Sequence, residues 1–184
     1  MKKARASVLL WEICGAVFII AFGAILHFIY GWTHFMPGIG FFGTVNGSVW
    51  EQLKLGFWPL VLFSILEYPF LSKKTKNFFF AKFIGLIVQV TIILTVFYTY
   101  SSILKKTILI VDIGSFLLAV IACQAVCFAM HSAKKHHSLA NAFSLFGLIF
   151  IAATFMLFTY VPPKLDIFKD RITGKYGTEW NVRK

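Results

Sequence analysis

The sequence predicts an all-α integral membrane protein, a helical bundle of five transmembrane helices. Hydrophobic residues make up 59% of the chain and charged residues 14%, whereas a soluble domain is typically about 45–50% apolar and about 25% charged. The mean hydropathy is +0.79. The apolar residues gather into five runs, each close to the length of about 20 residues that crosses a bilayer. This composition excludes a soluble globular enzyme, a disordered chain and a disulfide-stabilised scaffold.

The first run, residues 8–30, is predicted to be a retained helix. It follows a basic N-terminus, as the apolar part of a signal peptide does. However, it is too long for that role, contains Glu12 and lacks a small-residue cleavage site. The next residues, 31–45, are rich in glycine and aromatic side chains and are predicted to form a loop.

Four further spans follow, separated by short polar or basic segments. The second span begins at Ser48, whose spacing from Glu51 has the form of a capping box, and Pro59 is expected to kink that helix. A proline pair directly after residue 161 ends the last span. The predicted bundle therefore covers residues 1–161, with a polar C-terminal tail at 162–184 and the later spans at 48–71, 78–101, 107–130 and 139–161.

The distribution of lysine and arginine predicts the orientation in the membrane. Cytoplasmic loops carry an excess of these residues, so the N-terminus and the basic loops at 72–77 and 131–137 are expected inside. The loop at 31–45 has no lysine or arginine and is expected outside. Five spans then place the C-terminal tail outside, although it carries six cations. The inverted topology is the alternative.

Polar residues at one depth predict a binding site in the outer leaflet. Ionisable groups within spans are costly and usually face a partner or a cavity. We expect Glu51 and Asp112 to act as charged ligands and Lys54 to balance their charge, with two hydrogen-bonding residues beside them. The predicted ligand-binding residues are His27, Asn46, Glu51, Lys54 and Asp112.

Each of these residues also has a simpler structural interpretation. Glu51 and Lys54 are three residues apart on one helix and could pair with each other. Asp112 could pair with Lys105 or Lys106. Asn46 could be a turn residue or a helix cap, and the His27 ring could hydrogen-bond to a neighbouring carbonyl.

The charged residues near the inner ends of the spans are interpreted as structural. Glu67 could extend toward Lys73 or Lys74 in the basic loop. Glu12 and Lys82 could form an ion pair between two helices.

The sequence does not identify a cofactor, a metal or a catalytic residue. It contains no His-Glu-x-x-His pattern or other metal-ligand spacing. The histidines at 131, 136 and 137 flank lysines in a short segment, which is typical of a solvated basic loop near anionic lipid. The cations lie mostly at the ends of apolar runs, so the expected partners are membrane lipids and not nucleic acid.

Two stretches resemble a known family. One is Val-Asn-Gly-Ser-Val-Trp-Glu-Gln-Leu-Lys at 45–54, and the other runs from Phe158 through the proline pair to Gly177. Together they resemble a family of small bacterial multi-pass membrane proteins classed only as a domain of unknown function. The chain departs from the family pattern Asn-Glu-Ser-Val-Trp-Glu-His-Leu-Lys at Gly47 and Gln52. The resemblance implies a bacterial cytoplasmic membrane and supplies no catalytic residues.

The function predicted from these observations is the binding or transport of a small solute or ion through the outer-leaflet site. Five helices are few to enclose a transport pathway within one chain, so we expect transport to need a homodimer or a partner membrane subunit. One alternative is a membrane-embedded enzyme that acts on a lipid or isoprenoid headgroup. The other is a non-catalytic scaffold or regulatory subunit, whose partner surface would be the tail with Phe168, Tyr176 and Trp180.

Overall fold

A computed structural model describes residues 2–131 and 138–179 of the chain and confirms the all-α, five-span fold class. Helices account for most of the described residues, and no β-strand occurs among them. The helices long and apolar enough to cross a membrane are α1 (Lys2–Trp32), α3 (Val49–Leu71), α4 (Phe78–Leu104), α5 (Leu109–His131) and α6 (Ser138–Tyr160).

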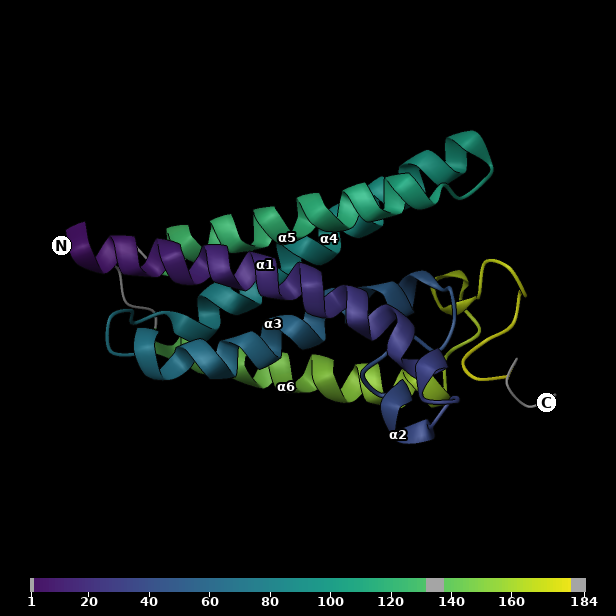
Figure 1. The fold of residues 1–184 in the computed structure, drawn as a ribbon, viewed down its shortest axis with the longest axis horizontal. Helices are drawn as coiled ribbons and strands as arrows, with labels where there is room; N and C mark the ends of the chain where they lie inside the picture. Colours follow the sequence, from purple (N-terminus) through teal and green to yellow (C-terminus); the bar gives the residue numbers. More distant parts are fainter. Residues whose placement is uncertain (1, 132–137, 180–184) are drawn as a thin grey trace.

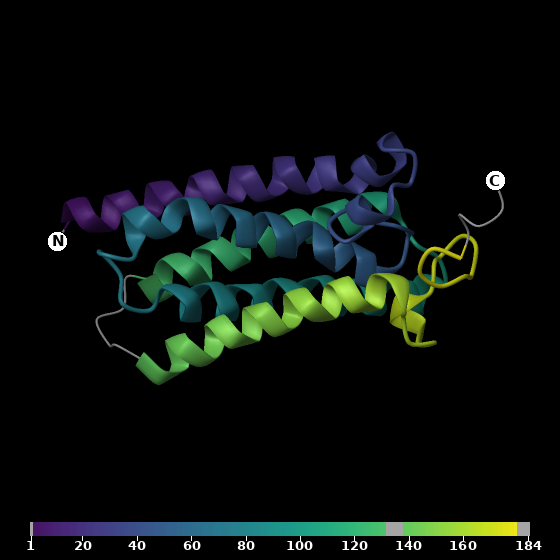
Figure 2. The same ribbon diagram turned by 90° about the horizontal axis from the view of Figure 1, so that it is seen from below.

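The five long helices run side by side along the long axis of the molecule (Figures 1 and 2). The chain begins at one end, called the N-terminal end here, where α3 also ends and α4 begins. The opposite end, called the tail end, carries the loop between α1 and α3 and the C-terminal residues up to 179. α3 is the central helix, because half of its span is buried, against 17% of the α6 span.

The segment after α1 was expected to be a loop throughout, but it contains a short helix. α1 continues to Trp32, and the chain then turns through His34 and Phe35, both with positive φ angles (52° and 62°). α2 (Pro37–Gly40) follows, with proline in its first turn, where the missing N–H costs nothing. This helical turn brings the Gly40 carbonyl to the end of the bundle, next to α3.

The start of α3 confirms the predicted cap. The Ser48 hydroxyl accepts a hydrogen bond from the Glu51 backbone N–H at 3.3 Å. The Glu51 carboxylate does not complete a reciprocal capping box, because it accepts from the Val45 N–H at 2.9 Å. The Asn46 side-chain oxygen accepts from the Ser48 N–H at 2.8 Å. The 45–48 segment is therefore a compact cap built from its own side chains.

The C-terminal tail folds back onto this cap. A 3₁₀ turn, η1 (Asp166–Phe168), carries Phe168 into the end of the bundle, where its ring centroid lies 4.7 Å from that of Trp50. Phe168 is 5% exposed, so its predicted role on an exposed partner surface is wrong. Trp180, assigned to the same surface, lies outside the described residues, as do His136 and His137 of the predicted basic loop.

Candidate functional site

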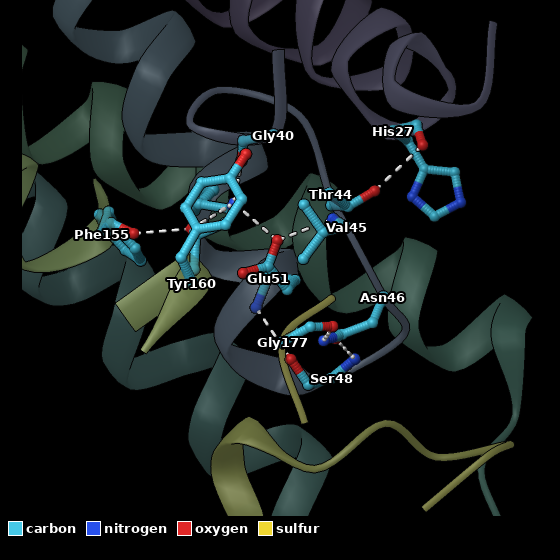
Figure 3. Close-up of polar contacts among 12 residues, drawn as sticks. His27, Gly40, Thr44, Val45, Asn46, Ser48, Glu51, Phe155, Tyr160 and Gly177 are labelled. Atoms are coloured by element: carbon cyan, nitrogen blue, oxygen red, sulfur yellow. Dashed lines mark hydrogen bonds and ion pairs between the residues drawn. The ribbon is translucent and has the colours of Figure 1, made fainter. Parts of the chain in front are cut away.

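At the tail end, Glu51 and Lys54 form a buried ion pair on the first turns of α3. The carboxylate and the ammonium are 2.6 Å apart, and both side chains are essentially inaccessible. The Lys54 ammonium also donates to the Gly40 carbonyl and to the Thr159 hydroxyl, each at 2.9 Å. An ammonium has three N–H donors, so these three acceptors use all of them. Figure 3 shows Glu51 at the centre of this arrangement, between the 40–48 loop and the end of α6.

The other predicted ligand-binding residues lie differently. Asn46 is close to this pair, and its amide donates to the Gly177 carbonyl at 2.9 Å, which ties the loop to the tail. The His27 ring is exposed and points away from Glu51 (Figure 3), and only the His27 carbonyl takes part, by accepting from the Thr44 hydroxyl at 3.0 Å.

Asp112 belongs to a separate contact on the α4–α5 hairpin. Its carboxylate accepts a hydrogen bond from the Tyr100 hydroxyl at 2.6 Å. The suggested pairing of Asp112 with Lys105 or Lys106 is therefore wrong. The structure gathers Glu51, Lys54 and Asn46 in one place but does not add Asp112 or the His27 ring to them.

At the N-terminal end, four ionisable side chains from four helices meet inside the bundle. They are Glu12 of α1, Glu67 of α3, Lys82 of α4 and His131 of α5, and we call them the four-helix cluster. The Lys82 ammonium lies 2.5 Å from the Glu67 carboxylate and 3.2 Å from the Glu12 carboxylate. The other Glu12 oxygen lies 2.8 Å from Nδ1 of His131. None of the four is more than 5% exposed.

The predicted ion pair between Glu12 and Lys82 is confirmed, whereas the predicted extension of Glu67 toward the basic loop is wrong. Glu67 is completely buried and pairs with Lys82. Lys74, one of its suggested partners, instead donates to the Ser7 hydroxyl at 3.0 Å. The predicted role of this inner group is structural, and the predicted group does not include His131.

Helical spacing could have identified the inward position of Glu12. Val8, Glu12, Gly15 and Ile19 are all buried, and their spacing of four, three and four residues defines one face of a helix. On α5, Gln124, Cys127 and His131 follow the same rule. A titratable side chain in register with apolar core residues is therefore the sequence signal for this cluster.

Neighbouring groups hold the cluster in place. The Gln124 amide donates to the Glu12 backbone carbonyl at 3.1 Å, and the Cys127 thiol donates to the Ala81 carbonyl at 3.4 Å. The Phe78 ring stacks on the His131 ring at a centroid distance of 5.5 Å and lies 5.9 Å from the Lys82 ammonium. The cluster is thus enclosed by packed side chains and not by solvent.

The hydrogen-bonding capacity of the four-helix cluster is incompletely used. Nε2 of His131 and both carboxylate oxygens of Glu67 have no hydrogen-bond partner among the described residues, apart from the ion-pair contact of Glu67 with Lys82. The cluster contains two carboxylates and one ammonium, so with a neutral imidazole it carries one net negative charge. A single added proton makes it neutral.

Among the described residues, no group of three His, Cys, Asp or Glu side chains is arranged to hold a metal ion. In the four-helix cluster the Lys82 ammonium occupies the position between the two carboxylates that a cation would need. The donor set therefore fits proton exchange better than metal coordination.

Five apolar helices with charged groups enclosed between them define a multi-pass membrane protein. The chain belongs to DUF6512, a family of unknown function whose model matches residues 1–178. The match includes both stretches that carry the resemblance and almost all of the described residues. No curated protein and no solved structure matches the chain.

Proposed function

We propose that the protein binds a small ion within the membrane, that this ion is a proton, and that the four-helix cluster is its binding site. The observation that supports the proposal is the contact between two buried carboxylates, one ammonium and one imidazole, supplied by four different helices. Chains of acidic and histidine side chains inside a membrane are typical of proton relays.

The charge balance distinguishes the cluster from a structural ion pair. Glu51 and Lys54 form a one-to-one pair in which every donor of the ammonium is used. The four-helix cluster has an extra carboxylate and unused acceptors. An uncompensated charge in a low-dielectric interior is strongly unfavourable, so the cluster is most stable when it holds one exchangeable proton.

In this proposal, His131 is the outermost member of the proton relay. His131 is the last residue of α5, at the N-terminal end of the bundle, and its Nε2 has no partner among the described residues. Its Nδ1 contacts Glu12, which in turn contacts Lys82. A proton accepted at Nε2 allows the imidazole to release another from Nδ1 to Glu12. A second copy of the chain or a partner subunit would complete a pathway across the membrane.

We also propose that the N-terminal end faces the cytoplasm of a bacterial cell and that the tail end faces outward. The basic residues of the N-terminus and of the 72–77 loop lie at the same end of the bundle, as the positive-inside rule requires. The bacterial cytoplasmic membrane is supported by the family resemblance alone.

Proton movement in liposomes tests this function. Purified protein is reconstituted in vesicles that contain a pH-sensitive dye, and a pH gradient is imposed with a potassium ionophore to balance charge. We expect the wild-type protein to dissipate the gradient faster than empty vesicles, and Glu12→Gln and Glu67→Gln to reduce that rate by about tenfold or more. Glu51→Gln, normalised to folded protein, is the control that keeps the wild-type rate.

Equal rates in the wild type, both cluster variants and empty vesicles would overturn the proposal and favour a scaffold role. Loss of flux in Glu51→Gln alone would instead support the predicted tail-end site with Asn46, Glu51 and Lys54. Turnover of a lipid headgroup by the same vesicles, abolished by Glu51→Gln, would support the enzyme alternative.

A further inference from the structure

Residues 169–176 of the tail form a small loop that begins and ends at the same point of the bundle. Lys169 and Tyr176 pair as an antiparallel β-bridge at the base of this loop. Directly before the bridge, the Phe168 ring packs on Trp50 in the first turns of α3. The tip of the loop is therefore held close to the ends of the membrane-spanning helices.

Arg171, next to the tip, shows how deep the loop lies relative to the helices. Its guanidinium carbon is 4.2 Å from the centroid of the Phe97 ring. Phe97 is a buried residue of α4 and lies about 10 Å along the helix axis from the last residue of α4, Leu104. Its neighbours Tyr98 and Tyr100 are side chains typical of the boundary between acyl chains and headgroups. The tip of the loop therefore lies beside α4 at the level of the membrane interface.

The tip presents one large apolar side chain to its surroundings. Ile172 is 93% exposed, more than any other large hydrophobic residue in the described part of the chain. Thr173 and Gly174 beside it are exposed as well. At the level of the interface, an isoleucine side chain that the protein leaves uncovered is stabilised when it enters the acyl region of the bilayer.

The charges of the loop favour anionic headgroups around this side chain. The two acidic groups are used within the protein. The Asp170 carboxylate accepts hydrogen bonds from three backbone N–H groups, and the Asp166 carboxylate lies 3.8 Å from the Arg171 guanidinium. By contrast, Lys169 and Lys175 have no ion-pair partner among the described residues. The loop therefore offers two ammonium groups to ligands outside the protein.

We infer that the 169–176 loop is a membrane anchor for the tail. Ile172 inserts among the acyl chains of the leaflet at the tail end, and Lys169 and Lys175 contact the phosphates of anionic lipids. Apolar insertion and attraction to anionic headgroups act together at such surfaces. The anchor lies at the opposite end of the bundle from the four-helix cluster, so it is independent of the proposed proton site and is tested by a different measurement.

Spin-label accessibility of the full-length protein in lipid nanodiscs tests the insertion. The label is attached at Ile172→Cys in a Cys14→Ser background, because Cys14 is exposed and the other two cysteines are buried. Labels at Ile110→Cys, on the exposed apolar surface of α5, and at Lys73→Cys, in the exposed loop before α4, are the membrane and water references. We expect the label at position 172 to be more accessible to oxygen, which partitions into the bilayer, than to an uncharged nickel chelate in water. The label at position 110 should show the same preference, and the label at position 73 the opposite one.

The charge of the lipid and the two lysines test the headgroup contact. Nanodiscs of phosphatidylcholine alone are compared with nanodiscs that also contain phosphatidylglycerol. We expect the anionic lipid to raise the ratio of oxygen to nickel accessibility at position 172 by about twofold or more. The double variant Lys169→Gln with Lys175→Gln should abolish this increase. Lys164→Gln is the matched control, because Lys164 is exposed but lies outside the loop, and it should keep the increase.

A label at position 172 that prefers the nickel chelate would overturn the inference, because the tip would then lie in water. Protection of this label from both reagents would also overturn it and would indicate that a protein partner covers Ile172. An accessibility ratio that does not respond to anionic lipid, or an increase that persists in the double lysine variant, would contradict the contact with lipid phosphates.

Discussion

Glu12 of α1 and His131 of α5 are 119 residues apart in sequence, yet the Glu12 carboxylate lies 2.8 Å from Nδ1 of His131. The contact joins the first membrane helix to the fourth at the N-terminal end of the bundle. Through the second Glu12 oxygen, it connects His131 to Lys82 and Glu67. This carboxylate is the centre of the four-helix cluster, because it contacts both the His131 imidazole and the Lys82 ammonium.

The Glu51–Lys54 pair should behave as a structural unit. Lys54→Met leaves the Glu51 carboxylate buried without its cation, and breaking a buried pair costs about 3–5 kcal/mol. The double variant Glu51→Gln with Lys54→Met removes both charges, so we expect it to recover most of that loss. Thermal unfolding in detergent, followed by helix content, measures all three proteins. A double variant as unstable as the sum of the two single variants would show that the charges are not coupled.

Gly56 should be required for the packing of α3 against α4. A Cβ atom at this position would overlap the side-chain amide of Gln89. The Gln89 side chain is flexible but only 1% exposed, so its amide has little free space into which to move. We therefore expect Gly56→Ala to destabilise the protein by about 1–3 kcal/mol, as overpacking of a core does, and Gln89→Ala to restore stability in the double variant. Gly114→Ala is the control. No neighbouring atom lies within 4 Å of its added Cβ, so it should stabilise α5 by about 0.5–1 kcal/mol.

Asp170 should make the attachment of the tail sensitive to acid. Burial raises the pKa of this carboxyl, but hydrogen bonds from Thr173 and from the Gly47 and Ile172 N–H groups outweigh that effect and lower its pKa below the ordinary value. A lowered pKa in the folded state contributes stability above the unfolded pKa of about 3.9, and this contribution is lost as the pH falls through the folded value.

Hydrogen exchange at the Gly47 and Thr173 amides measures this effect. We expect protection, corrected for the intrinsic pH dependence of exchange, to be constant near neutral pH and to fall below about pH 4. Asp170→Asn should show reduced protection already at neutral pH, because the amide offers one acceptor oxygen in place of two. Protection that stays the same at acid pH would show that the carboxylate does not hold the tail.

The fold class followed from the sequence because span length and hydrophobicity are properties of each segment alone. The site depended on helix rotation and on contacts between distant segments, which composition does not contain. Asp112 illustrates the effect of helix rotation. Its depth in the membrane follows from the sequence, but the rotation of α5 directs its carboxylate to Tyr100 and not to Glu51. Asn46 illustrates the contacts between distant segments, because its partner Gly177 lies 131 residues away and is reached only when the tail folds back.

For Glu12, the sequence does contain information about helix rotation. Its spacing from Val8 and Ile19 places it on the buried face of α1. What the spacing could not give was the convergence of Glu67, Lys82 and His131 on the same point. That convergence depends on how α3, α4 and α5 pack around α1.

Infrared difference spectroscopy during a pH titration tests most directly whether the four-helix cluster holds an exchangeable proton. We expect the wild-type protein to show a titrating carboxyl or imidazole band that is altered in Glu12→Gln, in Glu67→Gln and in His131→Gln. The same band should persist in Glu51→Gln. A spectrum in which none of the three cluster substitutions changes the titrating bands would contradict proton binding by Glu12, Glu67 and His131.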